Sequence, residues 1–262
     1  VTGGQERTVT ILGSTGTVGV NTIELIEEHN RTTPGAFRVV ALTANANVRD
    51  LAAQARRLRP AFVAVADEAA YAQLKSELSG SGMKLGAGAD AVHEAASMQA
   101  EWVMASIVGS AGLRPTLAAV ARGATVALAN KECLVCAGEL FMGEVKRGGA
   151  TLLPVDSEHN AVFQVFDAEQ SASIEHITLT ASGGPFRTFT AAQMAKVTPA
   201  EACKHPNYTM GAKISVDSAT LMNKGLELIE AHYLFGTAPE RLSVVVHPQQ
   251  IVHCLVAYLD GS

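Results

Sequence analysis

Two short segments of this sequence carry residue types that could do chemistry together. In Val155–Asn160 the carboxylates Asp156 and Glu158 stand two residues apart, so on an extended backbone both would point to one side. In Asn223–Glu227 an amide, an ammonium and a carboxylate lie within one helical turn and can face one cavity. Three carboxylates suit a hard cation such as Mg²⁺ or Mn²⁺, and an adjacent lysine and asparagine suit a phosphate. The pattern predicts a metal site beside an anion site.

Each segment also has an ordinary structural interpretation. An acid-x-acid pair is usually solvated surface, and Asn-Lys-Gly is usually a turn. However, Leu152–Val155 has the composition of a buried strand. It would place Asp156 at a strand end, where the sites of α/β proteins are found, and this position favours the functional interpretation.

Composition narrows the class of protein. The 262 residues suffice for two compact domains, and 48% hydrophobic with 17% charged residues indicates a globular chain. A net charge of −5 argues against a general nucleic-acid binder, and no apolar run reaches the roughly 18 residues of a membrane span. The polar start, Val1–Arg7, has no signal-peptide character. We therefore expect a cytoplasmic protein without nucleic-acid or membrane partners.

The first half of the chain has the pattern of a dinucleotide-binding unit. Thr8–Leu12 is a predicted buried strand, Gly13–Gly19 is a turn with G-x-x-G-x-x-G spacing, and an amphipathic helix follows. Backbone N–H groups and the helix dipole at such a turn favour a phosphate.

The end of the second predicted strand indicates which of the two nicotinamide nucleotides, NAD or NADP, this unit would bind. An NAD site usually has an acid there for the ribose 2′-hydroxyl, whereas Phe37–Leu42 is followed by no acid until Asp50. The missing carboxylate removes repulsion against a 2′-phosphate, and Arg49 could pair with one. The sequence predicts NADP rather than NAD.

Strand and helix patterns keep alternating up to residue 154. One of these strands, Thr125–Ala129, ends in Asn130, Lys131 and Glu132, where nicotinamide and substrate should meet. The other predicted elements are the helices Arg49–Leu58, Glu68–Leu78 and Leu113–Ala121 and the strands Ala61–Val65 and Trp102–Val108. We expect a Rossmann-like domain over residues 1–154 and an α+β domain over 155–262.

The second half would carry the substrate chemistry. A strand over Ile174–Thr180 leads into Ala181–Phe186, whose Ser182 and small residues suit close approach to a phosphate. His205–Gly211 resembles a mobile lid, and a single helix is expected to start at Ser215 and to carry Ser218 and Asn223 on to Glu227. The roles of His247 and His253 stay open.

In combination, these segments resemble the 1-deoxy-D-xylulose 5-phosphate reductoisomerase family. The similarity runs in order along essentially the whole chain, through Gly13–Gly16, Ala129–Glu132, Pro154–Asn160, Ser182–Phe186, His205–Asn207 and Met222–Glu227. The resemblance implies conversion of that phosphorylated sugar to 2-C-methyl-D-erythritol 4-phosphate in the non-mevalonate isoprenoid pathway. It also implies NADPH, a Mg²⁺, Mn²⁺ or Co²⁺ ion, a homodimer, and inhibition by fosmidomycin-type compounds.

The resemblance also assigns roles to individual residues. It gives Asp156, Glu158 and Glu227 to the metal, and Lys131 and Glu158 to proton handling. The substrate contacts it implies are Lys131, Ser157, Glu158, Ser182, His205, Ser218, Asn223, Lys224 and Glu227. The nucleotide contacts it implies are Thr15, Gly16, Thr17, Val18, Asn45, Ala46, Asn47, Asn130, Glu132 and Gly211.

Three features depart from the family pattern. Ala46 replaces a residue that is basic in many relatives, and Tyr208 replaces the usual lid tryptophan. The family also continues beyond this end into the rest of a sheet and a C-terminal helical domain. The strand Ile251–Leu259 is followed by the hairpin signal Asp260-Gly261 without a second strand. We expect the chain to be incomplete here, to bind NADPH but turn over poorly, and to self-associate through this edge.

Two alternatives remain open. One is another NADP-dependent dehydrogenase of a phosphorylated substrate, resembling aspartate-semialdehyde dehydrogenase, with Cys133 as its only plausible nucleophile. The other is a truncated nucleotide-binding module without turnover. The Cys133-x-x-Cys136 pair itself has no second half for zinc and no thioredoxin-like flanks.

Overall fold

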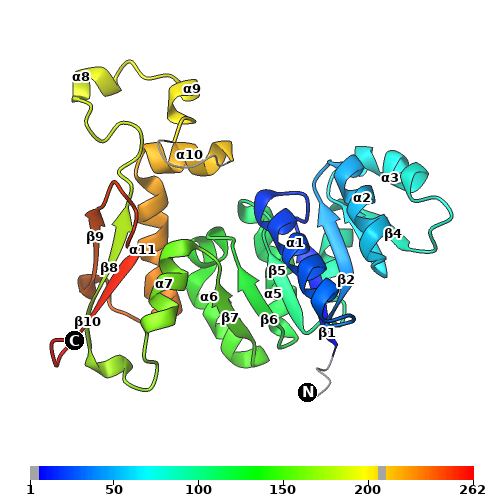
Figure 1. Cartoon of the computed structure of the whole chain (residues 1–262), viewed down its shortest axis with the longest axis horizontal. Coiled ribbons are helices and arrows are strands. Elements are labelled where there is room, and N and C mark those ends of the chain that lie inside the picture. Colours follow the sequence, from blue (N-terminus) through cyan, green and yellow to red (C-terminus); the bar gives the residue numbers. More distant parts are fainter. Residues whose placement is uncertain (1–5, 206–210) are drawn as a thin grey trace. The chain divides into compact units, whose positions relative to one another are not determined.

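The computed structural model describes residues 6–205 and 211–262. The chain folds as two compact units, Val1–Pro154 and Val155–Ser262, which run from blue to green and from green to red in Figure 1. Residues 206–210, with Tyr208 and most of the predicted lid, lie outside the described residues. None of the helices in the described part has the length and apolar character that a membrane crossing requires.

Seven parallel strands form the sheet of the first unit, in the order β4-β3-β2-β1-β5-β6-β7. They are β1 Arg7–Leu12, β2 Phe37–Ala44, β3 Phe62–Val65, β4 Lys84–Ala87, β5 Trp102–Ala105, β6 Thr125–Leu128 and β7 Thr151–Pro154. The helices are α1 Thr17–Thr32, α2 Val48–Leu58, α3 Tyr71–Glu77, α4 Gly88–Ser97, α5 Leu113–Ala121 and α6 Glu132–Gly148, with the short 3-10 helices η1 Glu68–Ala70 and η2 Ser110–Gly112.

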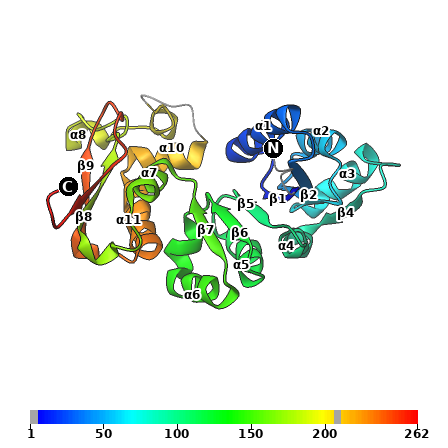
Figure 2. The ribbon, with the colours of Figure 1, turned by 60° about the horizontal axis from the view of Figure 1, so that its bottom comes forward.

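Helices cover both faces of this sheet. In Figure 2, α1, α2 and α3 lie on one side of the strands, and α4, α5 and α6 lie on the other. Right-handed crossovers produce this arrangement when the strand order runs outward in both directions from β1. Because both faces are covered, β3 is buried along its whole length and β1 and β2 over most of theirs. The predicted Rossmann-like α/β class agrees with the structure.

The order of the strands reverses at β1, which lies between β2 and β5. Ligands of open α/β sheets bind in the crevice at the carboxyl ends of the strands at such a reversal. The glycine turn after Leu12 and the segment after Ala105 meet there, since Ser106 donates a hydrogen bond from Oγ to the Leu12 carbonyl at 2.7 Å.

The second unit has a sheet of three strands in the order β10-β8-β9. β8 pairs antiparallel with β10 and parallel with β9. The strands of this unit are β8 Ile174–Ala181, β9 Leu242–Val246 and β10 Cys254–Tyr258. The helices of this unit are α7 Ser157–Val165, α8 Ala191–Met194, α9 Pro199–Ala202, α10 Ala212–Ala219 and α11 Met222–Phe235, with the short 3-10 helices η3 Ser171–Ser173 and η4 Pro239–Arg241.

Helices α7 and α11 pack on this small sheet, as Figure 1 shows. Val162 of α7 and Phe235 of α11 join Ile177 and Leu179 of β8 in a buried apolar cluster. Both helices are thereby fixed on one support. The N-terminal ends of α7 and α11 carry the carboxylate, amide and ammonium groups that the sequence analysis singled out.

Two expectations about this unit are wrong in detail. The single helix predicted from Ser215 to Glu227 is two helices, because Leu221 adopts a left-handed conformation with φ of 62° between α10 and α11. The strand predicted over Ile251–Leu259 is shorter, since β10 starts at Cys254, after Gln250 has taken a φ of 50°. Leu221 and Gln250 each redirect the backbone, although neither is a glycine or proline that would mark such a break in the sequence.

Candidate functional site

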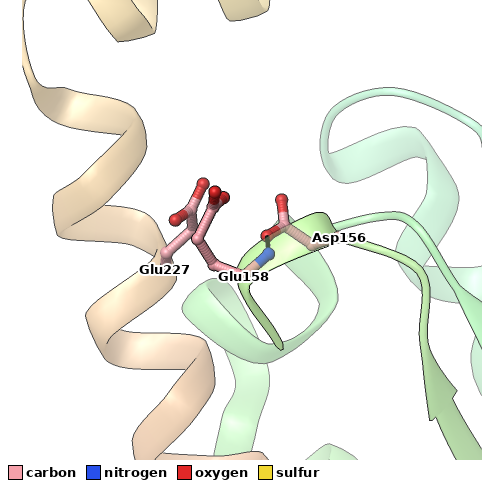
Figure 3. Close-up of side chains that lie close together, drawn as sticks. All are labelled: Asp156, Glu158 and Glu227. Carbon is pink, nitrogen blue, oxygen red and sulfur yellow. Dashed lines mark hydrogen bonds between the residues drawn. The ribbon is translucent and has the colours of Figure 1, made fainter. Parts of the chain in front are cut away.

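Three carboxylates converge in the second unit. Asp156, Glu158 and Glu227 each offer an oxygen, and these oxygens lie within 4.8 Å of one another. Figure 3 shows Glu227 reaching from α11 toward Glu158 and Asp156 at the start of α7. The predicted clustering agrees with the structure, although residues 156 and 227 are distant in sequence. Metal binding by the cluster stays a prediction.

The pair Asp156 and Glu158 is brought together by a helix terminus and not by a strand. Asp156 is the N-cap of α7, and its side chain accepts a hydrogen bond from the Glu158 N–H at 3.2 Å. Our expectation of an extended backbone through Asp156-x-Glu158 was therefore wrong. The reason is that Asp is a favoured N-cap, so the chain turns into a helix as soon as the strand ends.

The first turn of α11 supplies an amide and a cation to the same cluster, as its spacing predicted. The Asn223 side-chain amide and the Lys224 ammonium both donate to Glu227. The Lys224 nitrogen also lies 3.4 Å from a Glu158 oxygen. Glu158, Lys224 and Glu227 are all buried, so their charges interact more strongly than surface charges would.

Two histidines complete the surroundings of the carboxylates. His253 contacts Glu158 through Nδ1 at 2.8 Å, which gives a place to a residue whose role the sequence left open. The His159 ring is buried and its Nε2 lies 2.8 Å from the Glu227 carbonyl oxygen. Because a carbonyl only accepts, Nε2 carries a proton and donates. His159 thereby ties α7 to α11 directly behind the cluster.

A pocket of about 380 Å³ opens beside the carboxylates, a size within the usual range of small-molecule sites. It is lined by all the predicted metal and substrate residues of the second unit: Asp156, Ser157, Glu158, Ser182, His205, Ser218, Asn223, Lys224 and Glu227. The lining contains carboxylates together with hydroxyl, amide, imidazole and ammonium groups, and the Asn223 amide and the Lys224 ammonium are bonded to Glu227 itself. The pocket can therefore present oxygen ligands to a cation and donors to an anion.

The turn after β8 brings two of the hydroxyl-bearing segments together. Gly183 and Gly184 have φ of 81° and 68°, a backbone region that glycine tolerates. A Cβ at Gly184 would stand 2.6 Å from the Ser218 carbonyl oxygen. The small residues thus permit close approach of α10, which places Ser182 and Ser218 on one pocket.

His205 is held at this pocket by a hydroxyl. Its Nε2 lies 3.0 Å from Ser182 Oγ, which also accepts a hydrogen bond from the Gly184 N–H at 3.1 Å. Burial lowers the pKa of His205. A neutral ring at pH 7 is the expected state, in which one nitrogen donates a hydrogen bond and the other accepts one.

The glycine turn of the first unit has the geometry of a phosphate cradle. Gly13 has a φ of 85°, and a Cβ on Gly19 would stand 2.4 Å from the Gly13 carbonyl oxygen. These two glycines let α1 start tight against β1. Gly16, the N-cap of α1, has no side chain to cap the helix, and the first turn carries no acid. The predicted contacts Gly16 and Thr17 are exposed at this helix N-terminus, which suits an anion.

The residues after β2 lie on the surface at the same end of the sheet. Asn45, Ala46 and Arg49 are exposed. Asn47 caps α2, because its Oδ1 accepts from the Asp50 N–H at 3.2 Å and its Nδ2 donates to the Asp50 carboxylate at 2.7 Å. A nucleotide contact by Asn47 stays a prediction, and the structure gives its side chain a capping role.

Asn130, Lys131 and Glu132 follow β6, as the sequence predicted, and they lead into α6, a helix that was not among the predicted elements. The buried Asn130 donates from Nδ2 to the carbonyls of Ile107 and Gly109 at 2.5 and 2.8 Å, and its Oδ1 accepts from the Cys133 N–H at 2.8 Å. Its amide thus holds together the loops that follow β5 and β6. Lys131 and Glu132 are half-buried at the start of α6.

The predicted residues therefore form two groups. The first unit contains Asn130, Lys131 and Glu132 together with the predicted nucleotide contacts at 15–18 and 45–47. All metal residues, the other substrate residues and Gly211, which is the exposed N-cap of α10, belong to the second unit.

Sequence reasoning missed two positioning residues. Buried Gln54 of α2 accepts from the Ser14 hydroxyl at 2.7 Å and donates to the Ser14 carbonyl at 2.9 Å, so it holds the glycine turn. Buried Glu230 of α11 lies 3.5 Å from His159 Nδ1. A polar residue on the apolar face of a helix was the available signal in both cases.

The donor set fits a divalent cation. Carboxylate oxygens are among the ligands that Mg²⁺ and Mn²⁺ prefer. Two oxygens on opposite sides of a Mg²⁺ ion stand about 4.2 Å apart, so the cluster has nearly the right size and small side-chain movements would close it.

Two family profiles match this chain. The profile described as 1-deoxy-D-xylulose 5-phosphate reductoisomerase matches residues 9–138, and the one described as the C-terminal domain of the same enzyme matches residues 152–235. Similar proteins of that name include one from Rhodospirillum centenum, 64% identical over 98% of this chain and 63% of its own length. Another, from Zymomonas mobilis, is 55% identical over 98% of this chain and 66% of its own length.

Solved structures of the same name have the same fold. The Zymomonas mobilis enzyme in complex with NADPH is 53% identical, with a TM-score of 0.91 over 98% of this chain and 66% of its own. A reductoisomerase in complex with NADPH, fosmidomycin and magnesium is 42% identical, with a TM-score of 0.92 over 98% of this chain and 65% of its own. The chain thus spans slightly less than two thirds of the length of these relatives.

Proposed function

The chain belongs to the 1-deoxy-D-xylulose 5-phosphate reductoisomerase family, and we propose that its site serves that reaction. The substrate would be 1-deoxy-D-xylulose 5-phosphate, and the product 2-C-methyl-D-erythritol 4-phosphate, the isoprenoid precursor of the non-mevalonate pathway. The observation that carries the proposal is the convergence of Asp156, Glu158 and Glu227 on the pocket that also holds Ser182 and Lys224.

Asp156, Glu158 and Glu227 would hold a Mg²⁺, Mn²⁺ or Co²⁺ ion. When bound, such an ion acts as a Lewis acid toward the oxygens of a hydroxy-ketone. The N-cap bond from Glu158 to Asp156 and the His253 contact to Glu158 fix the carboxylates before binding. Preorganised ligands lose less freedom on binding, which strengthens it.

Ser182, Ser218, Asn223 and Lys224 would bind the substrate phosphate. Hydroxyl, amide and ammonium donors on one pocket suit its several oxygens. Because the phosphate is remote from the reacting carbons, its binding energy can orient the substrate toward the carboxylates. Glu158 and Lys131 are the groups that we assign to proton transfer.

The reductant would be NADPH. The glycine turn would receive the pyrophosphate at the start of α1. Arg49 is exposed after β2, and no acidic residue stands between the end of that strand and Arg49. Two of the similar solved structures are complexes with NADPH. This supports the choice of NADPH over NADH.

An activity assay tests the proposal directly. The chain is mixed with NADPH, Mn²⁺ and 1-deoxy-D-xylulose 5-phosphate, and the nicotinamide absorbance is followed. Loss of absorbance that requires all three supports the proposed function. Oxidation of NADPH without Mn²⁺, or with a phosphorylated aldehyde in place of this phosphorylated ketose, would overturn it.

The two alternatives predict different results in this assay. A dehydrogenase resembling aspartate-semialdehyde dehydrogenase would need a reactive cysteine, whereas Cys133 is fully buried in α6. A nucleotide-binding module would bind NADPH without consuming it. A homodimer and a cytoplasmic location stay predictions, which sedimentation and cell fractionation can test.

A further inference from the structure

Lys224 lies among the carboxylates that we assign to the metal. Its ammonium contacts Glu227 and stands 3.4 Å from Glu158. The side chain is 9% exposed, and those of Glu158 and Glu227 are 7% and 0% exposed. A cation and two anions are therefore buried together on adjoining turns of α7 and α11.

This arrangement has an electrostatic reason. Buried carboxylates are strongly destabilised unless a positive charge lies beside them. Lys224 provides that charge from within the chain. Its flexible four-carbon stem, unlike the planar fork of arginine, also allows the ammonium to move without a change of backbone.

The carboxylates that Lys224 contacts are two of the three that a divalent cation would need. Glu158 and Glu227 belong to the carboxylate cluster and also pair with Lys224. Two positive charges beside the same pair of carboxylates repel each other strongly in a buried site. Occupation by the ion therefore favours departure of the ammonium.

We propose that Lys224 is an internal competitor of the divalent cation, displaced from Glu158 and Glu227 when the ion binds. The proposal rests on the proposed metal site. Lys224 also lines the pocket that holds Ser182 and Ser218, so the displaced ammonium is within the space that the substrate phosphate would enter. Binding of the metal thus prepares the binding of the anion.

Metal binding by variants of the whole chain gives the first test. Free Mn²⁺ is measured by electron paramagnetic resonance during titration of wild type, K224M, K224R and K213M. Removing the competitor should tighten Mn²⁺ binding about tenfold in K224M. K224R keeps the positive charge and should not bind more tightly. K213M removes a half-exposed lysine that pairs with Asp217 within α10 and should behave as wild type.

Amine labelling of the wild-type chain gives the second test and needs no variant. Lys224 and Lys213 are acetylated with a reactive ester, and the modified peptides are quantified by mass spectrometry with and without Mn²⁺. Displacement should raise the acetylation rate of Lys224 at least about fivefold and leave that of Lys213 unchanged. This measurement separates movement of the ammonium from a simple effect of net charge.

The outcomes are distinguishable. Tighter Mn²⁺ binding in K224M together with faster labelling of Lys224 supports the proposal. Normal Mn²⁺ binding by wild type with unchanged labelling of Lys224 overturns it and leaves the proposed function intact. Absence of Mn²⁺ binding by wild type overturns the metal site and this proposal with it.

Discussion

The candidate sites of the two units are built in different ways. The glycine cradle of the first unit comes from one continuous stretch: β1, the turn Gly13–Gly16 and the start of α1 at Thr17. The carboxylate pocket of the second unit is assembled from α7, the end of β8, α10, α11 and the segment before β10. A local site depends on backbone geometry that a short sequence specifies. An assembled site depends on packing that places distant side chains together. The two should therefore respond to mutation in different ways.

The largest effect is expected from Glu227→Gln. The change removes a charged oxygen ligand that is fully buried beside Glu158 and Lys224. We expect Mn²⁺ affinity to fall at least about 100-fold, with loss of turnover and unchanged NADPH affinity. Calorimetric titration with Mn²⁺ and with NADPH measures the two affinities.

The matched control for this prediction is Glu175→Gln, an exposed glutamate of β8 in the same unit. It should change neither affinity. Unchanged Mn²⁺ binding in Glu227→Gln would show that the cluster is not the metal site, and weakened NADPH binding would show that the two sites do not behave independently.

Gly19→Ala should damage the local site through the backbone. The new Cβ would meet the Gly13 carbonyl oxygen at 2.4 Å and the Ser14 backbone at 2.6 Å. We expect a loss of about 3 kcal/mol in the free energy of unfolding and weaker NADPH binding, measured by urea denaturation and fluorescence titration.

Gly143 of α6 offers the control, because a Cβ there meets nothing within 4 Å. Gly143→Ala should stabilise the protein by about 0.5–1 kcal/mol, since alanine is the better helix former. Equal stability of the two variants would contradict the steric account of the turn.

How much the sequence predicts also differs between the two units. The strand–turn–helix order of the cradle was predicted, since glycines between a strand and a helix have few alternative structures. The start of the helix at Thr17, inside the predicted turn, and the support from Gln54 were missed. The residues of the assembled pocket were also identified, but partly for a wrong reason. Asp156 and Glu158 meet through an N-cap, and the chain between Ser218 and Asn223 bends at Leu221.

The supporting contacts could not be predicted because they are long-range. His253 meets Glu158 across 95 residues of sequence, and His159 meets the Glu227 carbonyl across 68. No local pattern announces such pairs. They follow from the packing of α7 and α11 on β8, which the order of elements alone does not define.

Arg49→Ala tests the nucleotide preference of the local site with a moderate effect. If exposed Arg49 pairs with the 2′-phosphate, NADPH binding should weaken about tenfold, the usual contribution of a charge-assisted hydrogen bond. NADH binding should not change. Arg31→Ala, at an exposed arginine of α1 paired with Glu28, should affect neither. Equal losses for both nucleotides would contradict the assignment of Arg49.

The smallest effect concerns His205. Burial lowers the pKa of its ring, so the folded chain holds this proton less tightly than the unfolded chain. As pH falls through the ordinary histidine range, the unfolded chain is protonated first, so the free energy of unfolding decreases. Above that range the ring is neutral in both states, and His205 no longer makes the free energy of unfolding depend on pH. Titration of the ring by NMR should give a lower midpoint in the folded protein than in urea. A higher midpoint would contradict the direction.

Anomalous X-ray diffraction from crystals grown with Mn²⁺ tests the central claim most directly. We expect one strong peak within about 2.2 Å of oxygens from Asp156, Glu158 and Glu227, with no such peak in Glu227→Gln. A peak elsewhere in the wild-type chain, or no peak under conditions where Mn²⁺ binds in solution, would show that these three carboxylates are not the metal site.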